Sequence, residues 1–251
     1  MTDWVIPVDA EFADVHVGMR TAEIEQPAGV GGLELFHTAV LGMRPCRGAE
    51  PVELTWRRPV SATTGTAPVR LCALVTRWRT EGRSGVLSTA LRLAGPDGAE
   101  VQDATVLWQV NDVVVGDADS AARVAWDFGS VPWGQHLATR LREDQEFAAT
   151  TATFDGTIAL RSGAHEVQFR VYRGQIIEVS RKSLTDFTFC VQASERTWVE
   201  LLAAPRNDFL RRAVARQFSV RGNGFQYLRL HKALMIIIDR AREAAAEAHG
   251  A

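Results

Sequence analysis

The sequence has few cysteines, almost no net charge and no long apolar run. Cys46, Cys72 and Cys190 are odd in number and form no C-x-x-C pair, so the sequence suggests neither a disulfide framework nor a zinc knuckle. The formal charge of -2 over 251 residues gives the molecule no overall field that would attract a nucleic acid. The longest apolar run, Ala233–Ile238, is far shorter than the ~20 residues of a membrane-spanning helix.

Patterns that bind metals or cofactors are also missing. His16, His136, His165 and His231 have no Asp, Cys or second His at metal-ligand spacing, so we expect no metal site. The glycines within 29–32 do not continue into a Lys-Ser/Thr pair or a G-x-G-x-x-G pattern, so we expect no cofactor. No charged-then-apolar leader opens the chain. We therefore expect a cytoplasmic protein without integral membrane association and without a nucleic-acid partner.

The composition that is present predicts a folded protein of two parts. An apolar share of 46% with 23% charged residues is typical of globular domains, and the length suits one large domain or two ordinary ones. A segment of small and charged residues within 111–132 separates two complete patterns. We expect one domain over 1–118 and a second over 126–251, both of the α+β class.

The first part predicts an antiparallel sheet that wraps around one helix. Leu33, Phe36, Val40 and Met43 recur at helical spacing and predict a helix over 29–43. Segments rich in β-branched and aromatic residues predict strands over 52–56, 69–78, 85–93 and 104–110. Pro and Asp-Gly within 94–98 predict a hairpin turn.

The second part predicts a sheet with several helices. Strands are expected over 156–161, 166–171, 175–179, 186–192 and 217–221, with turns at Ser162-Gly163 and Arg173-Gly174. Helices are expected over 133–147, over 195–203 with Ser194 as its N-cap, around Phe209 and Leu210, and from about 225 to 246. The middle of the last helix is apolar nearly all round, so we expect it to be largely buried.

The order of these elements resembles the sterol carrier protein 2 (SCP2) domain. The resemblance is carried by Phe154-Asp-Gly-Thr-Ile-Ala-Leu160, Val171-Tyr-Arg-Gly-Gln-Ile-Ile177, the stretch 187–198, and Phe218-Ser-Val-Arg-Gly-Asn-Gly-Phe-Gln-Tyr-Leu228. It implies that a fatty acid, an acyl-CoA or a sterol binds in a tunnel between the sheet and the helices.

Large apolar side chains of this part offer more surface than one small sheet needs against its helices, and an acyl chain can take up the remainder. We expect the ligand to contact Phe187, Phe189, Val191, Trp198, Leu201, Leu202, Phe218, Phe225, Leu234 and Ile237. The same spacings also fit an ordinary core, packed at native density with no tunnel.

The first part resembles a hot-dog domain of the MaoC-like hydratase group. Pro7-Val-Asp-Ala-Glu-Phe-Ala13, Gly29-Val-Gly-Gly32 and the stretch 52–60 carry this resemblance. The order of hydratase and carrier also resembles the end of peroxisomal multifunctional β-oxidation enzymes. That group's acid–base pair is an Asp followed five residues later by a His. Here the His position falls on Pro7 and the Asp would precede Met1, so these groups cannot add water to an enoyl thioester.

Glu34 and His37 are the candidate catalytic residues. They lie three residues apart and share one face of the predicted helix. Hot-dog thioesterases and dehydratases place a carboxylate on this helix, where it can activate water at an acyl thioester. The alternative is a solvated or salt-bridged Glu34 beside a hydrogen-bonded His37.

One basic cluster remains, formed by Arg206, Arg211, Arg212, Arg216 and Arg221. It suits either a CoA phosphate or acidic headgroup, or simply a solvated helix face. Three functions stay open: a lipid or acyl-CoA carrier with a degenerate, dimerising hot-dog part; an acyl-CoA thioesterase or enoyl-CoA hydratase-like enzyme that uses Glu34; and a partner-binding protein whose own side chains fill the pocket. We predict the first, as a homodimer that binds a fatty acid, an acyl-CoA or a sterol.

Overall fold

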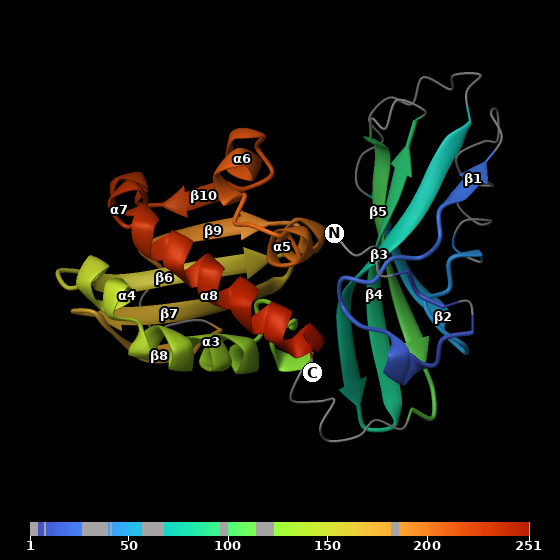
Figure 1. The fold of residues 1–251 in the computed structure, drawn as a ribbon, viewed down its shortest axis with the longest axis horizontal. Helices are drawn as coiled ribbons and strands as arrows, with labels where there is room; N and C mark the ends of the chain where they lie inside the picture. The colour runs from blue at the N-terminus through green and yellow to red at the C-terminus, as the bar shows by residue number, and fades with distance from the viewer. Residues whose placement is uncertain are drawn as a thin grey trace. The chain divides into compact units, whose positions relative to one another are not determined.

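The computed structural model describes residues 5–7, 9–26, 40, 42–56, 68–95, 100–113, 123–181 and 186–250. Apart from Met1, the chain divides into two compact units, Thr2–Gly116 and Asp117–Ala251 (Figure 1). Each unit has its own five-stranded sheet, and the fold class is α+β, as predicted. The two units are described separately below.

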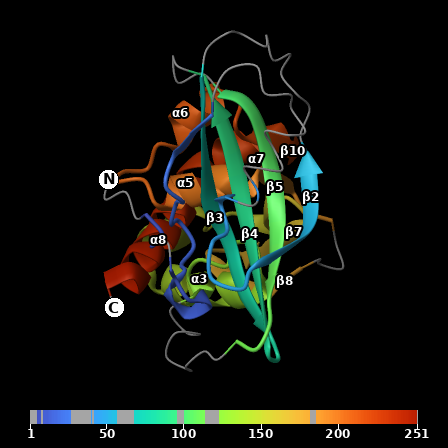
Figure 2. The same cartoon turned by 90° about the vertical axis from the view of Figure 1, so that its right-hand side faces the viewer.

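The sheet of the first unit is antiparallel throughout, with strand order β1-β3-β4-β5-β2. Its strands are β1 (Ile24–Gln26), β2 (Glu50–Trp56), β3 (Val69–Glu81), β4 (Ser84–Ala94) and β5 (Glu100–Val110). Figure 2 shows β3, β4 and β5 side by side. The four predicted strands are confirmed, whereas β1 and the short helix η1 (Phe12–Asp14) were not predicted. Most of the predicted helix over 29–43 and the predicted turn within 94–98 lie outside the described residues.

Aromatic side chains attach the N-terminal segment of this unit to its sheet. The rings of Phe12 and Trp78 stack with centroids 4.6 Å apart, and Trp78 Nε1 donates a hydrogen bond to the carbonyl oxygen of Phe12 at 3.1 Å. A Cβ on Gly85 would lie 2.4 Å from the Phe12 ring. Only glycine therefore lets η1 come this close to β4.

The second unit combines a mixed sheet with six helices in the described residues. Its strands are β6 (Asp155–Ser162), β7 (His165–Tyr172), β8 (Gln175–Ser180), β9 (Phe189–Ala193) and β10 (Ser219–Gly222). Its helices are α3 (Val131–Glu143), α4 (Gln145–Thr150), α5 (Glu195–Leu202), α6 (Phe209–Val214), α7 (Gly224–Arg229) and α8 (His231–Gly250). The strand order is β10-β9-β6-β7-β8, and only β6 and β9 run parallel.

The meander β6-β7-β8 forms as predicted, because glycines permit both reversals. Gly163 has φ 58° in the first turn, and Arg173 and Gly174 have φ 46° and 87° in the second. This left-handed region suits a tight hairpin between twisted strands.

Helices cover this sheet at close range. Figure 1 shows α3, α4 and α8 together on one side of the sheet, and α3 packs on β7, β8 and α8. A Cβ on Gly134 of α3 would lie 2.5 Å from Val167 Cγ2 and 2.8 Å from Val179 Cγ1. The middle of α8 is buried as predicted, with Ala233, Leu234, Ile237 and Ile238 in the core.

Two predicted helices are each split into two. The helix expected over 133–147 ends at Glu143, because Asp144 accepts a hydrogen bond from the backbone N–H of Phe147 at 2.9 Å and starts α4. The helix expected from about 225 to 246 is broken at Leu230, which leaves helical geometry (φ -98°, ψ 14°) and buries its side chain. Both breaks are corrections to the sequence prediction.

Two predicted strands begin later than expected. The strand expected at 186 begins at Phe189, because Thr188 is engaged with Thr157: its backbone N–H donates to the Thr157 carbonyl, and its side-chain oxygen accepts from the Thr157 N–H. The strand expected at 217 begins at Ser219, after the buried Phe218.

Candidate functional site

A series of aromatic rings runs through the interior of the second unit. Phe128 stacks on Trp198 with centroids 4.1 Å apart, and it lies 4.5 Å from the ring of Trp133. Trp198 in turn meets Phe218 at 4.8 Å, and Phe218 meets Phe209 at 4.8 Å. The rings belong to α3, α5, α6 and the segments before α3 and β10, so the series joins the helices to the edge of the sheet.

The series continues from α6 toward α7. The Phe209 ring lies 6.2 Å from His231, His231 lies 6.0 Å from Tyr227, and Tyr227 meets Phe189 edge to face at 5.8 Å. Tyr227 is half-buried, and burial raises the pKa of its hydroxyl. The aromatic series therefore reaches the surface at α7.

Hydrogen bonds of nearby residues hold the indole of Trp198 in place. Ser194 caps α5 by accepting a hydrogen bond from the Thr197 N–H at 3.1 Å, which satisfies a free donor of the first helical turn. Trp198 Nε1 donates to the Arg161 carbonyl of β6 at 2.8 Å. With its polar atom satisfied, the rest of the Trp198 side chain is free for apolar packing.

The structure buries most of the predicted ligand-contacting side chains. The following have exposed fractions between 0% and 7%: Phe189, Val191, Trp198, Leu201, Leu202, Phe218, Leu234 and Ile237. Phe187 precedes β9 and is half-buried. Phe225 lies on α7 and is 72% exposed. A ligand that reaches the buried members must displace part of their packing.

Helix α7 is the least anchored element beside the aromatic series. None of its six residues is buried, although it packs on β9, β10 and α8. Its polar ties are the capping bond from the Gln226 N–H to Asn223 Oδ1 at 3.0 Å, the hydrogen bond from the Asn223 N–H to the Thr188 carbonyl at 2.8 Å, and the contacts of Arg229 with Gln226 and Thr153. No buried side chain therefore anchors α7.

Exposed apolar side chains gather on three successive elements, which we call the apolar edge. They are Leu210 and Val214 on α6, Val220 on β10, and Phe225 and Leu228 on α7, with exposed fractions of 55%, 85%, 36%, 72% and 71%. Figure 1 shows α7, β10 and α6 along one edge of the sheet. Sequence reasoning included only Phe225 of this group as a ligand contact. The spacings of three and four residues within the two helices were the available signal.

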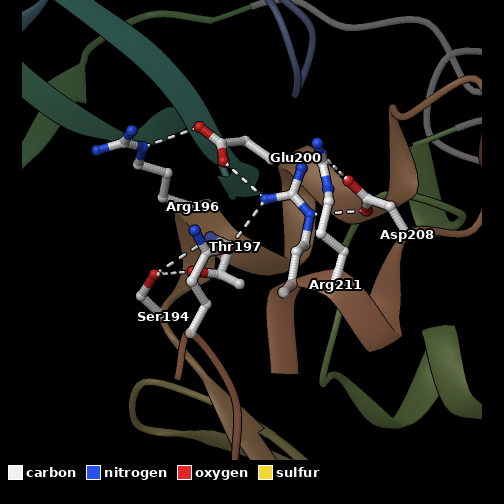
Figure 3. A network of polar contacts seen from close by, with 8 residues as sticks. Ser194, Arg196, Thr197, Glu200, Asp208 and Arg211 are labelled. Atoms are coloured by element: carbon white, nitrogen blue, oxygen red, sulfur yellow. Dashed lines mark hydrogen bonds and ion pairs between the residues drawn. The ribbon is translucent and has the colours of Figure 1, made fainter. Parts of the chain in front are cut away.

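Ion pairs hold α6 to α5 (Figure 3). Glu200 accepts from Arg196 Nε at 2.9 Å and from Arg212 Nη1 at 3.0 Å. Arg212 Nε also donates to Asp208 Oδ1 at 2.7 Å, and Asp208 Oδ2 accepts from Arg211 at 2.5 Å. Two members of the predicted basic cluster are thus occupied in bracing the fold.

The two carboxyl groups of this network, Glu200 and Asp208, have lowered pKa values. Burial alone would raise the pKa of Glu200, but the charges and hydrogen bonds of Arg196 and Arg212 outweigh it and hold that pKa below its usual range. Burial likewise opposes the hydrogen bonds of Arg212 and Arg211 at Asp208, and the pKa of Asp208 is again lowered. Neither carboxyl holds a proton near neutrality, so the network is suited to structure rather than to proton transfer.

Comparisons with known proteins concern the fold. No family model and no curated protein matches the sequence. A crystal structure of sterol carrier protein 2 is similar at 16% identity and a TM-score of 0.41, covering 47% of this chain and 98% of that one. The solution structure of the sterol carrier protein domain 2 of Helicoverpa armigera is similar at 13% identity and a TM-score of 0.31, covering 45% and 86%.

The second group of similar structures comprises hydratases. An (R)-hydratase from Pseudomonas aeruginosa, in its unliganded form, is similar at 14% identity and a TM-score of 0.31, covering 41% of this chain and 86% of that one. Both groups that the sequence resembles are therefore found among similar solved structures. The site is described from this chain's own residues, because a likeness at these scores says nothing of a ligand.

The predicted catalytic residues cannot be placed. Glu34 and His37 lie outside the described residues. Pro7 is described and exposed, and its side chain has no group that donates or accepts a proton. Burial raises the pKa of the Cys46 and Cys190 thiols to about 11, so neither is a thiolate near neutrality.

Two further findings limit the site. Within the described part of the chain, no cluster of three or more His, Cys, Asp or Glu side chains is placed to hold a metal ion. In that same part, no helix combines the length and apolarity needed to cross a membrane.

Proposed function

We propose that the unit Asp117–Ala251 binds and carries a hydrophobic small molecule, namely a fatty acid, an acyl-CoA or a sterol. The observation that carries this proposal is the aromatic series, which leads from the buried Trp198 to α7, a helix with no buried residue. The resemblance of the sequence to the sterol carrier protein 2 domain supports it.

Access of the ligand follows from the unequal anchoring of α6 and α7. Arg212 ties α6 to α5 through Glu200, at 3.0 Å, so the α6 side of the site stays in place. Outward movement of α7 uncovers Phe189 of β9, against which Tyr227 packs at 5.8 Å. An acyl chain can then lie on the aromatic rings that α7 covered.

Binding of a lipid can offset the free-energy cost of moving α7. Moving α7 uncovers Phe189 and separates it from Tyr227, whereas Phe225 and Leu228 are already mostly in water. Full burial of a large apolar side chain contributes roughly 1.5–3 kcal/mol. Covering Phe225 and Leu228 with the ligand therefore offsets the contacts that α7 gives up.

Native mass spectrometry of the purified full chain, followed by extraction and identification of bound lipid, tests the proposal. We expect a mass increment of a fatty acid, acyl-CoA or sterol that disappears on delipidation and returns when the same lipid is added. A chain that is bare as purified and stays bare with all three classes favours the alternative, a partner-binding protein whose core its own side chains fill.

A further inference from the structure

The segment 205–232 concentrates positive charge. It holds seven basic residues and one acidic residue, a formal charge of +6, in a chain whose total is -2. The remainder of the chain therefore carries -8. The same segment contains α6, β10 and α7 and thus the whole apolar edge.

Not all of this charge is neutralised. Arg211 and Arg212 pair with Asp208, and Lys232 pairs with Glu146 at 2.7 Å. Arg206, Arg216, Arg221 and Arg229 are exposed, and the described residues place no carboxylate within ion-pair distance of any of these four. The guanidinium groups of Arg206, Arg216 and Arg221 can therefore meet an external anion, whereas Arg229 already donates to Gln226 and Thr153.

The apolar edge and the exposed arginines come from the same three elements, α6, β10 and α7, and the segments next to them. Leu210 and Val214 lie one turn apart on α6, as do Phe225 and Leu228 on α7. Val220 lies between them on β10, the edge strand, whose four residues are all exposed. Figure 1 shows α7, β10 and α6 in succession along the upper side of this unit.

The combination of exposed apolar side chains and exposed arginines fits one class of partner. A nucleic acid would satisfy the arginines but leave five large apolar side chains in water. A bilayer with anionic headgroups satisfies both, because apolar side chains enter the boundary of headgroups and acyl chains while arginines stay at the level of the phosphates. Basic residues near such a surface each contribute roughly a fivefold increase in binding.

We propose that α6, β10 and α7 form a docking surface for a membrane with anionic headgroups. Docking brings α7 against the lipid, where a carried molecule can be exchanged. The proposal goes beyond ligand binding and stands on the charge and exposure of this surface alone.

Co-sedimentation of the full chain with vesicles tests the proposal. The vesicles are made either of phosphatidylcholine or of phosphatidylcholine and phosphatidylserine in equal parts. We expect binding to the mixed vesicles, little binding to the neutral ones, and weakening by salt. The variant R206Q/R216Q/R221Q removes three free charges, so its binding constant should fall by roughly a hundredfold.

A control variant that removes three arginines elsewhere distinguishes the effect of this surface from the effect of the overall charge. Arg142, Arg173 and Arg181 are exposed and lie beside β8, the opposite edge strand. R142Q/R173Q/R181Q should keep most of the vesicle binding. Equal loss in both triple variants, or equal binding to neutral and mixed vesicles, overturns the proposal.

A second variant tests the apolar part. Leu210→Ser with Val214→Ser changes exposed side chains of α6, and we expect weaker vesicle binding, most clearly at high salt. Undiminished binding by this variant, or its conversion from a dimer to a monomer in sedimentation, would mean that a polyanion or a second copy occupies the surface instead.

Titration of R206Q/R216Q/R221Q with a fatty acid in the absence of vesicles keeps the two proposals apart. We expect lipid uptake equal to that of the unchanged chain. If the unchanged chain binds vesicles but takes up no lipid, the docking proposal holds and the carrier function is wrong. If it takes up lipid but binds no vesicles, the carrier function holds and the docking proposal is wrong.

Discussion

The indole of Trp198 meets the ring of Phe218 edge to face, with centroids 4.8 Å apart and an interplanar angle of 81°. Trp198 belongs to α5, and Phe218 directly precedes the edge strand β10, so this contact joins the core to the apolar edge. An edge-to-face pair contributes about 0.5–1.5 kcal/mol beyond its buried area. Because Trp198 is 1% exposed, its emission reports any rearrangement between α5 and β10.

Gly134→Ala should destabilise the second unit, even though alanine favours helices by about 1 kcal/mol over glycine. The added Cβ would lie 2.5 Å from Val167 Cγ2, and overpacking of this kind costs roughly 1–3 kcal/mol. Urea unfolding should show a net loss of up to about 2 kcal/mol. Gln135→Ala, at the exposed next position of α3, is the control and should be neutral or stabilising. A gain in stability for Gly134→Ala would show that α3 does not rest on β7 and β8 as described.

Stability should fall in acid as the α5–α6 network is protonated. The folded-state pKa of Glu200 and that of Asp208 are both lowered, so their stabilisation is present above the ordinary carboxyl pKa of about 4. It is lost as the pH falls through the lowered folded-state values. Thermal unfolding between pH 7 and pH 3 measures the trend.

The substitution Glu200→Gln measures how much the α5–α6 ion pairs contribute to stability. Breaking a largely buried pair costs about 3 kcal/mol, so we expect a loss of this order at pH 7 and a smaller further loss in acid than the unchanged chain shows. Glu178→Gln, on the exposed face of β8, should change neither. An unchanged free energy of unfolding for Glu200→Gln would mean that the ion pairs do not brace α6.

Enoyl-CoA hydration should be absent. The resemblance of the first unit to the hydratase group places Pro7 at the position of that group's histidine, which is the basis of this expectation. If thioester hydrolysis is found, Glu34 is the expected base, and Glu34→Gln should lower its rate by ~10²–10⁴-fold. An equal rate in this variant would remove Glu34 as the base, and trans-2-enoyl-CoA hydration above background would contradict the degenerate assignment.

The first unit should mediate a homodimer. Its edge strand β2 exposes Val52 and Leu54, and unpaired apolar edges are commonly covered by a second copy. Sedimentation velocity of the full chain should show a dimer at micromolar concentration, and Val52→Lys with Leu54→Lys should shift it to monomer. Thr55→Lys, at the next exposed position, is the control. A monomeric unchanged chain would contradict the prediction.

Local patterns predicted the parts of the fold that depend on neighbouring residues. The meander β6-β7-β8 follows from alternation of apolar residues and from turns with Gly163 and Gly174. Ser194 was identified as a cap because the capping bond spans three residues.

Elements that depend on distant partners were missed. The break at Asp144 is supported by Arg240, whose Nε lies 2.7 Å from Asp144 Oδ2 across 96 positions of the chain. The break at Leu230 places that side chain in the core and leaves Leu228 outside. No sequence period encodes which of these two leucines is buried, so the exposure of the apolar edge became visible only in the structure.

The account depends on α7 as the route for the ligand. Phe225→Ser with Leu228→Ser should weaken fatty acid binding, because these side chains would cover the bound chain. Stability without ligand should change by no more than about 0.5 kcal/mol, since both side chains are exposed. Tyr172→Ser with Ile177→Ser, both exposed on β7 and β8 of the same unit, is the matched control and should bind fatty acid normally.

Titration of the full, delipidated chain with a long-chain fatty acid, an acyl-CoA and a sterol, followed by thermal unfolding and tryptophan emission, is the most direct test of ligand binding. A molecule that binds only the folded state adds about 2.7 kcal/mol of stability at a hundred times its dissociation constant. We therefore predict that at least one of the three raises Tm in proportion to the logarithm of its concentration, with an emission change that Trp198→Phe abolishes. If all three leave both Tm and emission unchanged, the unit Asp117–Ala251 is not a lipid carrier.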